Sequence, residues 1–332
     1  MNRSIRFAAL AAAVVLQTSC GGSNAVNPAH PVYPAVQPLH ALVNGAPPHA
    51  SGAQAIYSIT YYNDDLEYWP LSPDGGKRPT ILSAKASHEG MAADGNDLLV
   101  GAANSSALEI FDTATQTAKT FSNPFGPPGD VAVDRQHNIY VFDFATPPGN
   151  VAEFPAADRN HPFELTCNQI YIGGQLAVDD EGDVFAVTTG PPPGYPSLVL
   201  EFAKTVTGHS ACANLDLIDP ANSPSGLALD PQTDDLLIMD NPDQCAGGFE
   251  GRVRIYSKPY QKGNYRILNM GANCAGGLRL SADSKQIFAG DEDVSGSFFY
   301  IIQRGYPGGR KLGNFWNGAA TGFATIPNTL PN

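Results

Sequence analysis

The chain has 332 residues, and its 19 lysines and arginines against 32 aspartates and glutamates give a formal net charge of −13. A surface of that sign repels phosphates, so the composition excludes a nucleic-acid-binding protein and favours a neutral or cationic partner. After the N-terminal segment, no apolar run reaches the length that a membrane-spanning helix needs.

The first twenty residues have the pattern of an export signal. Arg3 and Arg6 form a positive region, an apolar stretch follows at 7–16, and Cys20 ends the segment. This ending resembles the lipobox of bacterial lipoproteins, although Gln17 stands where an aliphatic residue is usual. The resemblance implies that Cys20 becomes a lipidated N-terminus. The alternative is an ordinary cleaved signal that leaves a free cysteine.

Lipidation predicts a protein anchored to the cell membrane or the outer membrane, facing the periplasm or the cell surface. Gly21 replaces the aspartate that retains enterobacterial lipoproteins at the inner membrane. Residues 21–52 form the predicted tether, since no charged residue lies between Gly21 and Ser51 and prolines recur at 28, 31, 34, 38, 47 and 48. Prolines keep such a segment extended and prevent a packed element.

From residue 53 to 332 the chain repeats one pattern six times. A short apolar strand recurs around an anchor residue, and the anchors are spaced 40, 45, 51, 51 and 45 residues apart. They are Met91, Val131, Leu176, Leu227, Leu278 and Phe323. A repeat of this length with several short strands in each unit indicates a β-propeller. Six anchors predict six blades.

Each repeat continues with a second apolar strand and with a third strand that ends on an aromatic residue, as at 139–141 and 151–154. The N-terminal strands at 56–59 and 66–69 match these two strands, but no first strand precedes them. A first strand without followers stands at 322–326. We therefore expect the C-terminal inner strand to join three N-terminal strands and close the ring, which removes the exposed edges.

The turns at Pro128-Gly129-Asp130-Val131-Ala132-Val133-Asp134 and Ser223-Pro224-Ser225-Gly226-Leu227 resemble NHL repeats. The wider group of six-bladed propellers related to the senescence-marker-protein/gluconolactonase family is similar as well, from about Ala53 to the C-terminus. The resemblance implies the fold far more than an activity, because one fold supports many functions. The first prediction is accordingly a non-catalytic scaffold that binds a protein or a carbohydrate, without a cofactor.

Gluconolactonase-like enzymes hold a divalent cation at the channel mouth, and the resemblance extends partly to those ligands. His88-Glu89-Gly90 resembles the glutamate motif, and Asp240 resembles the aspartate that follows a second strand. Ser225 replaces the ligand asparagine. A metal-dependent lactonase with calcium or another divalent cation at Glu89 and Asp240 is therefore the alternative. A purely structural envelope protein is the third possibility.

The remaining candidate ligand-binding residues are aromatic, and Tyr195, Phe315 and Trp316 fall in predicted mouth-side loops together with acidic residues. Aromatic rings beside carboxylates suit a sugar ring or a cationic peptide. The repeated Asp94, Asp134, Asp179 and Asp230 are predicted to cap the turns that follow the inner strands. We expect a monomer.

Four cysteines follow Cys20, and an even number in an exported chain predicts two disulfides with three possible connectivities. Cys245 and Cys274 fall on the same predicted face of adjacent blades, so we expect them to pair. Cys167 and Cys212 then pair by elimination.

Overall fold

A computed structural model describes fifteen segments of the chain. They are residues 55–60, 66–70, 80–83, 88–102, 106–113, 117–143, 148–218, 223–241, 251–272, 275–280, 284, 286–293, 296–303, 310–315 and 320–326. Cys20, the predicted signal segment and the predicted tether all lie outside these residues. Among the described residues, no helix is long and apolar enough to cross a membrane.

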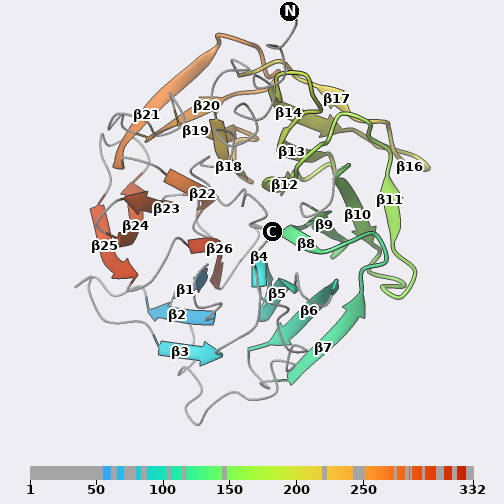
Figure 1. Cartoon of the computed structure of the whole chain (residues 1–332), viewed down its shortest axis with the longest axis horizontal. Helices are drawn as coiled ribbons and strands as arrows, with labels where there is room; N and C mark the ends of the chain where they lie inside the picture. The colour runs from blue at the N-terminus through green and yellow to red at the C-terminus, as the bar shows by residue number, and fades with distance from the viewer. Residues whose placement is uncertain are drawn as a thin grey trace, which may run out of the picture.

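The strands form six antiparallel four-stranded sheets arranged as the blades of a propeller (Figure 1). From the inner strand outwards, blade I contains β26 (Ala320–Ile326), β1 (Ala55–Thr60), β2 (Leu66–Pro70) and β3 (Thr80–Ser83). Blade II contains β4 (His88–Asp94), β5 (Asp97–Ala102), β6 (Ala107–Asp112) and β7 (Thr117–Ser122). Blade III contains β8 (Pro128–Val133), β9 (Ile139–Asp143), β10 (Asn150–Phe154) and β11 (Phe163–Leu165).

The other three blades follow the same order. Blade IV contains β12 (Leu176–Val178), β13 (Val184–Thr189), β14 (Ser197–Phe202) and β17 (Ala213–Asn214). Blade V contains β18 (Ser223–Leu229), β19 (Leu236–Asn241), β20 (Gly251–Tyr256) and β21 (Tyr265–Ala272). Blade VI contains β22 (Ala275–Leu280), β23 (Gln286–Asp293), β24 (Gly296–Gln303) and β25 (Arg310–Phe315). The prediction of a six-bladed all-β propeller is confirmed.

The ring closes in blade I, as the sequence predicts. The C-terminal strand β26 pairs antiparallel with β1, with Tyr57 opposite Ala324. It also contacts the inner strands on both sides, β4 of blade II and β22 of blade VI. In Figure 1 the red β26 lies beside the dark blue β1 near the centre of the ring. The two ends of the described propeller are therefore joined by the backbone pairing of β26 with β1, so the C-terminal strand completes blade I instead of standing alone.

The apolar core lies between the blades. Alternate residues of each strand face opposite neighbours, and among the described residues separate clusters lie between blades II and III, III and IV, IV and V, and V and VI. Blades III and IV enclose Tyr140, Phe142 and Phe202, for example, and each of these is fully buried. Five anchors, those in β4, β8, β12, β18 and β22, are at most 2% exposed. Because each blade is stabilised mainly by its two neighbours, the ring is the unit of stability.

Blade IV departs from the repeat at its outer edge. Its fourth strand, β17, has only two residues, and a small hairpin of β15 (Lys204–Thr205) and β16 (Gly208–His209) is inserted before it. This insertion is not visible in the sequence, because two-residue strands leave no periodicity to recognise.

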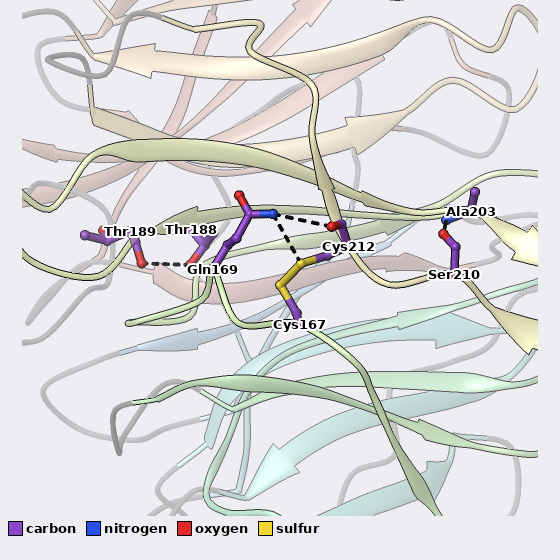
Figure 2. The surroundings of a disulfide bond; sticks show 7 residues. All are labelled: Cys167, Gln169, Thr188, Thr189, Ala203, Ser210 and Cys212. Carbon is purple, nitrogen blue, oxygen red and sulfur yellow. Dashed lines mark hydrogen bonds between the residues drawn. A yellow bond between two sulfur atoms is a disulfide. The ribbon is translucent and has the colours of Figure 1, made fainter.

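A disulfide joins Cys167, which follows β11 of blade III, to Cys212, which precedes β17 of blade IV (Figure 2). Their Cα atoms lie 5.2 Å apart. The Cys212 amide donates to the Thr166 carbonyl, and the Gln169 side chain donates to the Cys212 carbonyl. This half of the disulfide prediction is confirmed. The other predicted pair, Cys245 and Cys274, lies outside the described residues.

Candidate binding site on the propeller axis

The inner strands approach one another closely around the axis at the position just before each anchor. Four blades have glycine there. A Cβ atom on Gly90 would lie 2.1 Å from the carbonyl oxygen of Gly129, and one on Gly226 would lie 2.8 Å from the carbonyl carbon of Gly277. Backbone atoms cannot give way as flexible side chains do, so Gly90 and Gly226 are required for this approach.

Blades III and IV carry Asp130 and Gln175 at the same position, and both side chains bind peptide groups of other inner strands. Asp130 Oδ2 accepts from the Leu176 amide at 2.8 Å. Gln175 Oε1 accepts from the amides of Leu227 and Leu278, each at 3.0 Å. An inner strand has no further strand to pair with on its axial side, so these side chains supply acceptors that a neighbouring strand would otherwise provide.

Arg279 completes this network from blade VI. Its Nη2 donates to the Met91 carbonyl at 3.1 Å and to Asp130 Oδ1 at 2.7 Å, and its Nη1 donates to the Leu278 carbonyl at 2.9 Å. We call Asp130, Gln175 and Arg279 the axial hub. The hub bonds involve the inner strands of blades II to VI, so it ties together blades that are not neighbours.

The hub contains a buried charge pair. The Asp130 side chain is 4% exposed and the Arg279 side chain 16%. Burial raises the pKa of the Asp130 carboxyl, while the Arg279 guanidinium and the Leu176 amide act in the opposite direction. The pair is therefore the element of the hub most sensitive to the loss of one partner.

A cavity of about 160 Å³ lies on the axis from the level of the anchors to the turns after the inner strands. Small side chains form much of its wall. The position after the anchor is alanine in five blades and arginine in the sixth, namely Ala92, Ala132, Ala177, Ala228, Ala324 and Arg279. The charged residues of the lining are Asp134, Arg135, Asp179, Asp180, Asp230, Asp234 and Arg279. Acidic groups outnumber basic ones, so the cavity suits a neutral or cationic group.

The turn aspartates on this wall cap backbone amides, as predicted. Asp134 Oδ1 accepts from the Asn138 amide at 2.8 Å, and its Oδ2 accepts from the Asn138 side chain and the Tyr140 hydroxyl. Asp179 Oδ1 accepts from the amides of Glu181 and Asp183 at 2.9 and 2.8 Å. Asp230 accepts from the Gln232 amide and the Thr233 hydroxyl. Asp94 differs, since its carboxylate pairs with the ring of His137 at 2.8 Å.

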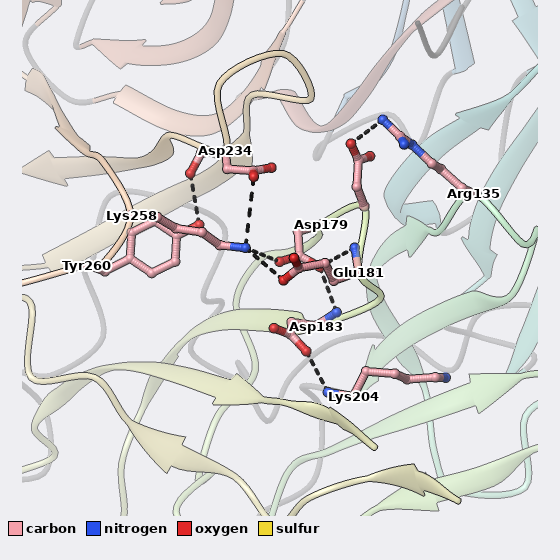
Figure 3. A network of polar contacts seen from close by, with 9 residues as sticks. Arg135, Asp179, Glu181, Asp183, Lys204, Asp234, Lys258 and Tyr260 are labelled. Atoms are coloured by element: carbon pink, nitrogen blue, oxygen red, sulfur yellow. Dashed lines mark hydrogen bonds and ion pairs between the residues drawn. The ribbon is translucent and has the colours of Figure 1, made fainter. Parts of the chain in front are cut away.

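Basic side chains span the blades around the cavity (Figure 3). Lys258 Nζ lies 3.1 Å from both Asp179 Oδ2 and Glu181 Oε2 and 4.0 Å from Asp234 Oδ2. Arg135 of the blade III turn forms an ion pair with Asp180 of the blade IV turn. Asp179, Glu181 and Asp183 offer carboxylate oxygens within 4.8 Å of one another, and the Lys258 ammonium is the cation that contacts the first two.

The structure places the residues predicted from sequence in separate environments. Asp240, at the end of β19, is fully buried, and its Oδ2 accepts from Arg252 Nε at 2.9 Å and Arg254 Nε at 2.7 Å. The Tyr195 ring packs against Tyr171 with centroids 5.3 Å apart.

The backbone of Glu89 lies in β4 and that of Phe315 ends β25, whereas Trp316 lies outside the described residues. The described cavity extends from the level of the anchors to the turns after the inner strands, whereas Glu89 precedes the anchor of β4 by two residues. Sequence reasoning missed the hub, although Asp130, Gln175 and Arg279 each depart from the residue type that the repeat favours.

Comparison with known proteins identifies the class of fold. The chain matches one chain in the crystal structure of a nidogen/laminin complex with a TM-score of 0.63 and 14% identity, over 83% of this chain and 99% of that one. It matches a luciferin-regenerating enzyme with a TM-score of 0.58 and 12% identity, over 78% and 91% of the two chains. Hydrazine synthase from Kuenenia stuttgartiensis matches with a TM-score of 0.50 and 12% identity, over 74% and 75%.

These similarities establish a six-bladed β-propeller and, at such low identity, nothing about activity. No family model matches the chain. No curated protein matches it either.

Proposed function

We propose that this protein is an exported lipoprotein, anchored to a membrane through Cys20, whose propeller is a non-catalytic scaffold that binds a protein or carbohydrate partner. The proposal that the propeller is non-catalytic rests on one observation. Each of the five aspartates on the cavity wall engages a donor or a cation of the chain itself. A carboxylate used as a general base or a nucleophile needs an oxygen available to the substrate, whereas these groups shape and stiffen the wall.

The charge of the molecule defines the chemistry of the partner. The chain carries a formal net charge of −13, and the cavity lining is acidic. Such a surface attracts cationic groups, tolerates neutral ones and repels phosphates. The resemblance to a chain from a nidogen/laminin complex agrees with a role in protein binding.

The second candidate is a metal-dependent lactonase, and the luciferin-regenerating enzyme of similar fold is an example of a propeller that supports catalysis. Calcium or another divalent cation would be held by Glu89 and Asp240. Against it, two arginine side chains already donate to Asp240 Oδ2. A cation at that oxygen would be repelled by both guanidinium groups, so the scaffold is the better supported function.

The anchor and the binding function are tested separately. Cys20→Ala should release the protein from the membrane fraction and abolish fatty-acid labelling; a wild-type chain that is never labelled contradicts the anchor.

For binding, the full chain in detergent is titrated with a lysine-rich peptide and with neutral oligosaccharides. Asp234→Asn should weaken peptide binding several-fold, while Asp158→Asn, at a site outside the cavity lining, is the matched control. If the wild type hydrolyses a lactone in the presence of a metal ion and Glu89→Ala abolishes this activity, the protein is the lactonase and the scaffold proposal is wrong.

A further inference from the structure

The hairpin inserted in blade IV is held against the rest of the propeller by two contacts with the turn that follows β12. The Lys204 amide donates to Asp183 Oδ1 at 2.5 Å, and His209 Nε2 lies 2.9 Å from the Gly182 carbonyl oxygen. The same turn contains Asp179 and Asp180, which line the axial cavity. The position of the hairpin is therefore linked to the wall of the cavity.

The other ring nitrogen of His209 faces a carboxylate of blade III. His209 Nδ1 lies 3.3 Å from Glu153 Oε2, and the two side chains are 1% and 6% exposed. Neither atom has a well-aligned hydrogen bond within the described part of the chain. The contact joins β16 of blade IV to β10 of blade III across the interface between the blades.

These contacts determine where protons lie. A carbonyl oxygen only accepts, so His209 Nε2 carries a hydrogen. With a neutral ring, Nδ1 would present a lone pair to the carboxylate, and two acceptors would face each other in a water-free contact. We propose that Glu153 and His209 hold one proton between them, and that this proton latches the hairpin onto blade III as a pH-sensitive clasp.

The other charged and titratable groups around the pair favour an imidazolium facing a carboxylate. Lys204 Nζ, on the hairpin, lies 3.9 Å from Glu153 Oε1 and stabilises the ionised carboxyl. The Tyr140 ring, on β9, meets the His209 ring edge-on with centroids 5.6 Å apart. Burial, together with the charges of Asp134 and Glu153, raises the pKa of Tyr140, which therefore stays neutral and donates its hydroxyl to Asp134.

The sign of the pH dependence follows from the shared proton. The docked hairpin holds this proton between Glu153 Oε2 and His209 Nδ1, and an open hairpin separates the two atoms. Raising the pH removes the proton and leaves a buried carboxylate against a lone pair, so the hairpin opens at alkaline pH. Cys212, three residues beyond His209, is bonded to Cys167. Opening of the hairpin therefore remains local. It releases the contacts to Gly182 and Asp183 and loosens one side of the cavity.

Two measurements on the full chain test the clasp, and neither depends on the proposed binding function. The first is histidine-selective NMR of the wild type between pH 5 and 9, with His209→Gln used to assign the signal. At pH 7 we expect the signal of a His209 ring that carries a hydrogen on both nitrogens, with Nδ1 facing Glu153 Oε2. A neutral His209 beside an ionised Glu153 at pH 7 overturns the proposal.

The second measurement is hydrogen exchange of residues 204–209 at pH 6.5 and pH 9. In the wild type the protection, corrected for intrinsic exchange, should fall by about tenfold or more between the two pH values. In Glu153→Gln the amide donates to a neutral Nδ1 without any shared proton, so the change should stay within about twofold. Asp158→Asn, which alters the exposed pair with His161, should behave as the wild type. Equal pH profiles for the wild type and Glu153→Gln contradict the clasp.

Discussion

The turns after the inner strands and the positions beside the anchors are built on different principles. At the end next to the turns, Asp134, Asp179 and Asp230 repeat one device, and each caps amides within its own blade. At the positions beside the anchors, the hub residues stand where other blades have glycine or alanine, and they bind peptide groups of other blades. The residues that recur in the repeat thus form the individual blades, and the residues that depart from the repeat connect different blades.

The largest effect should come from opening the ring, on which both the turns and the hub depend. Deleting residues 322–332 removes most of β26, the strand that pairs with β1 and contacts β4 and β22. Each blade is stabilised mainly by its neighbours, so we expect aggregation or loss of cooperative thermal unfolding measured by circular dichroism. Deleting only residues 327–332 leaves β26 intact and is the control. A long deletion variant that melts like the full chain contradicts ring closure.

The hub should be the next most sensitive feature. Arg279→Met leaves Asp130 buried without its cation, which should lower the free energy of unfolding by about 3–5 kcal/mol. Adding Asp130→Asn to this variant should restore part of the loss, since no buried charge is then left unpaired. Urea denaturation of the two single variants and the double variant measures this coupling. Additive effects of the two substitutions would show that the hub pair does not couple the blades.

The same variant has a pH signature. Burial already raises the pKa of Asp130, and removal of Arg279 raises it further above the value of the unfolded chain. A carboxyl whose pKa is raised in the folded state binds its proton more tightly there, so lowering the pH stabilises the fold. The free energy of unfolding of Arg279→Met should therefore increase from pH 7 to about pH 5 by more than that of the wild type.

Recurring residues could be predicted from the sequence, and residues that occur once could not. The ring, its closure at β26 and the turn caps come from residues that recur, and recurrence is visible without a structure. The hub, the Lys258 contacts and the clasp of Glu153 with His209 join residues far apart in the chain that occur once each. Asp130 and Arg279 are separated by 149 positions, and only the closed ring brings them together. Such sites are visible in sequence only as exceptions to the repeat.

At the outer edge of the propeller, the disulfide joins blades III and IV covalently. Replacing Cys167 and Cys212 by alanine frees a loop with a sequence separation of 45 and should lower the free energy of unfolding by roughly 4 kcal/mol on the chain-entropy estimate. Urea denaturation of this variant and of the wild type measures the loss. Peptide mapping that finds Cys167 bonded to a different cysteine would contradict this pairing.

The smallest effect should come from the repeated caps, because each serves one turn. Asp134→Ala removes the acceptor for the Asn138 amide and for the buried Tyr140 hydroxyl. Leaving those donors without a partner should cost about 1–3 kcal/mol of stability. Asp158→Ala is the matched control, since its pair with His161 is exposed to solvent and its loss should leave thermal unfolding unchanged. Asp134→Asn keeps an acceptor for the amide and should fall between the two. If Asp134→Ala instead abolishes cooperative unfolding as the ring deletion does, the caps hold the whole propeller together and the distinction between local turns and a shared hub is wrong.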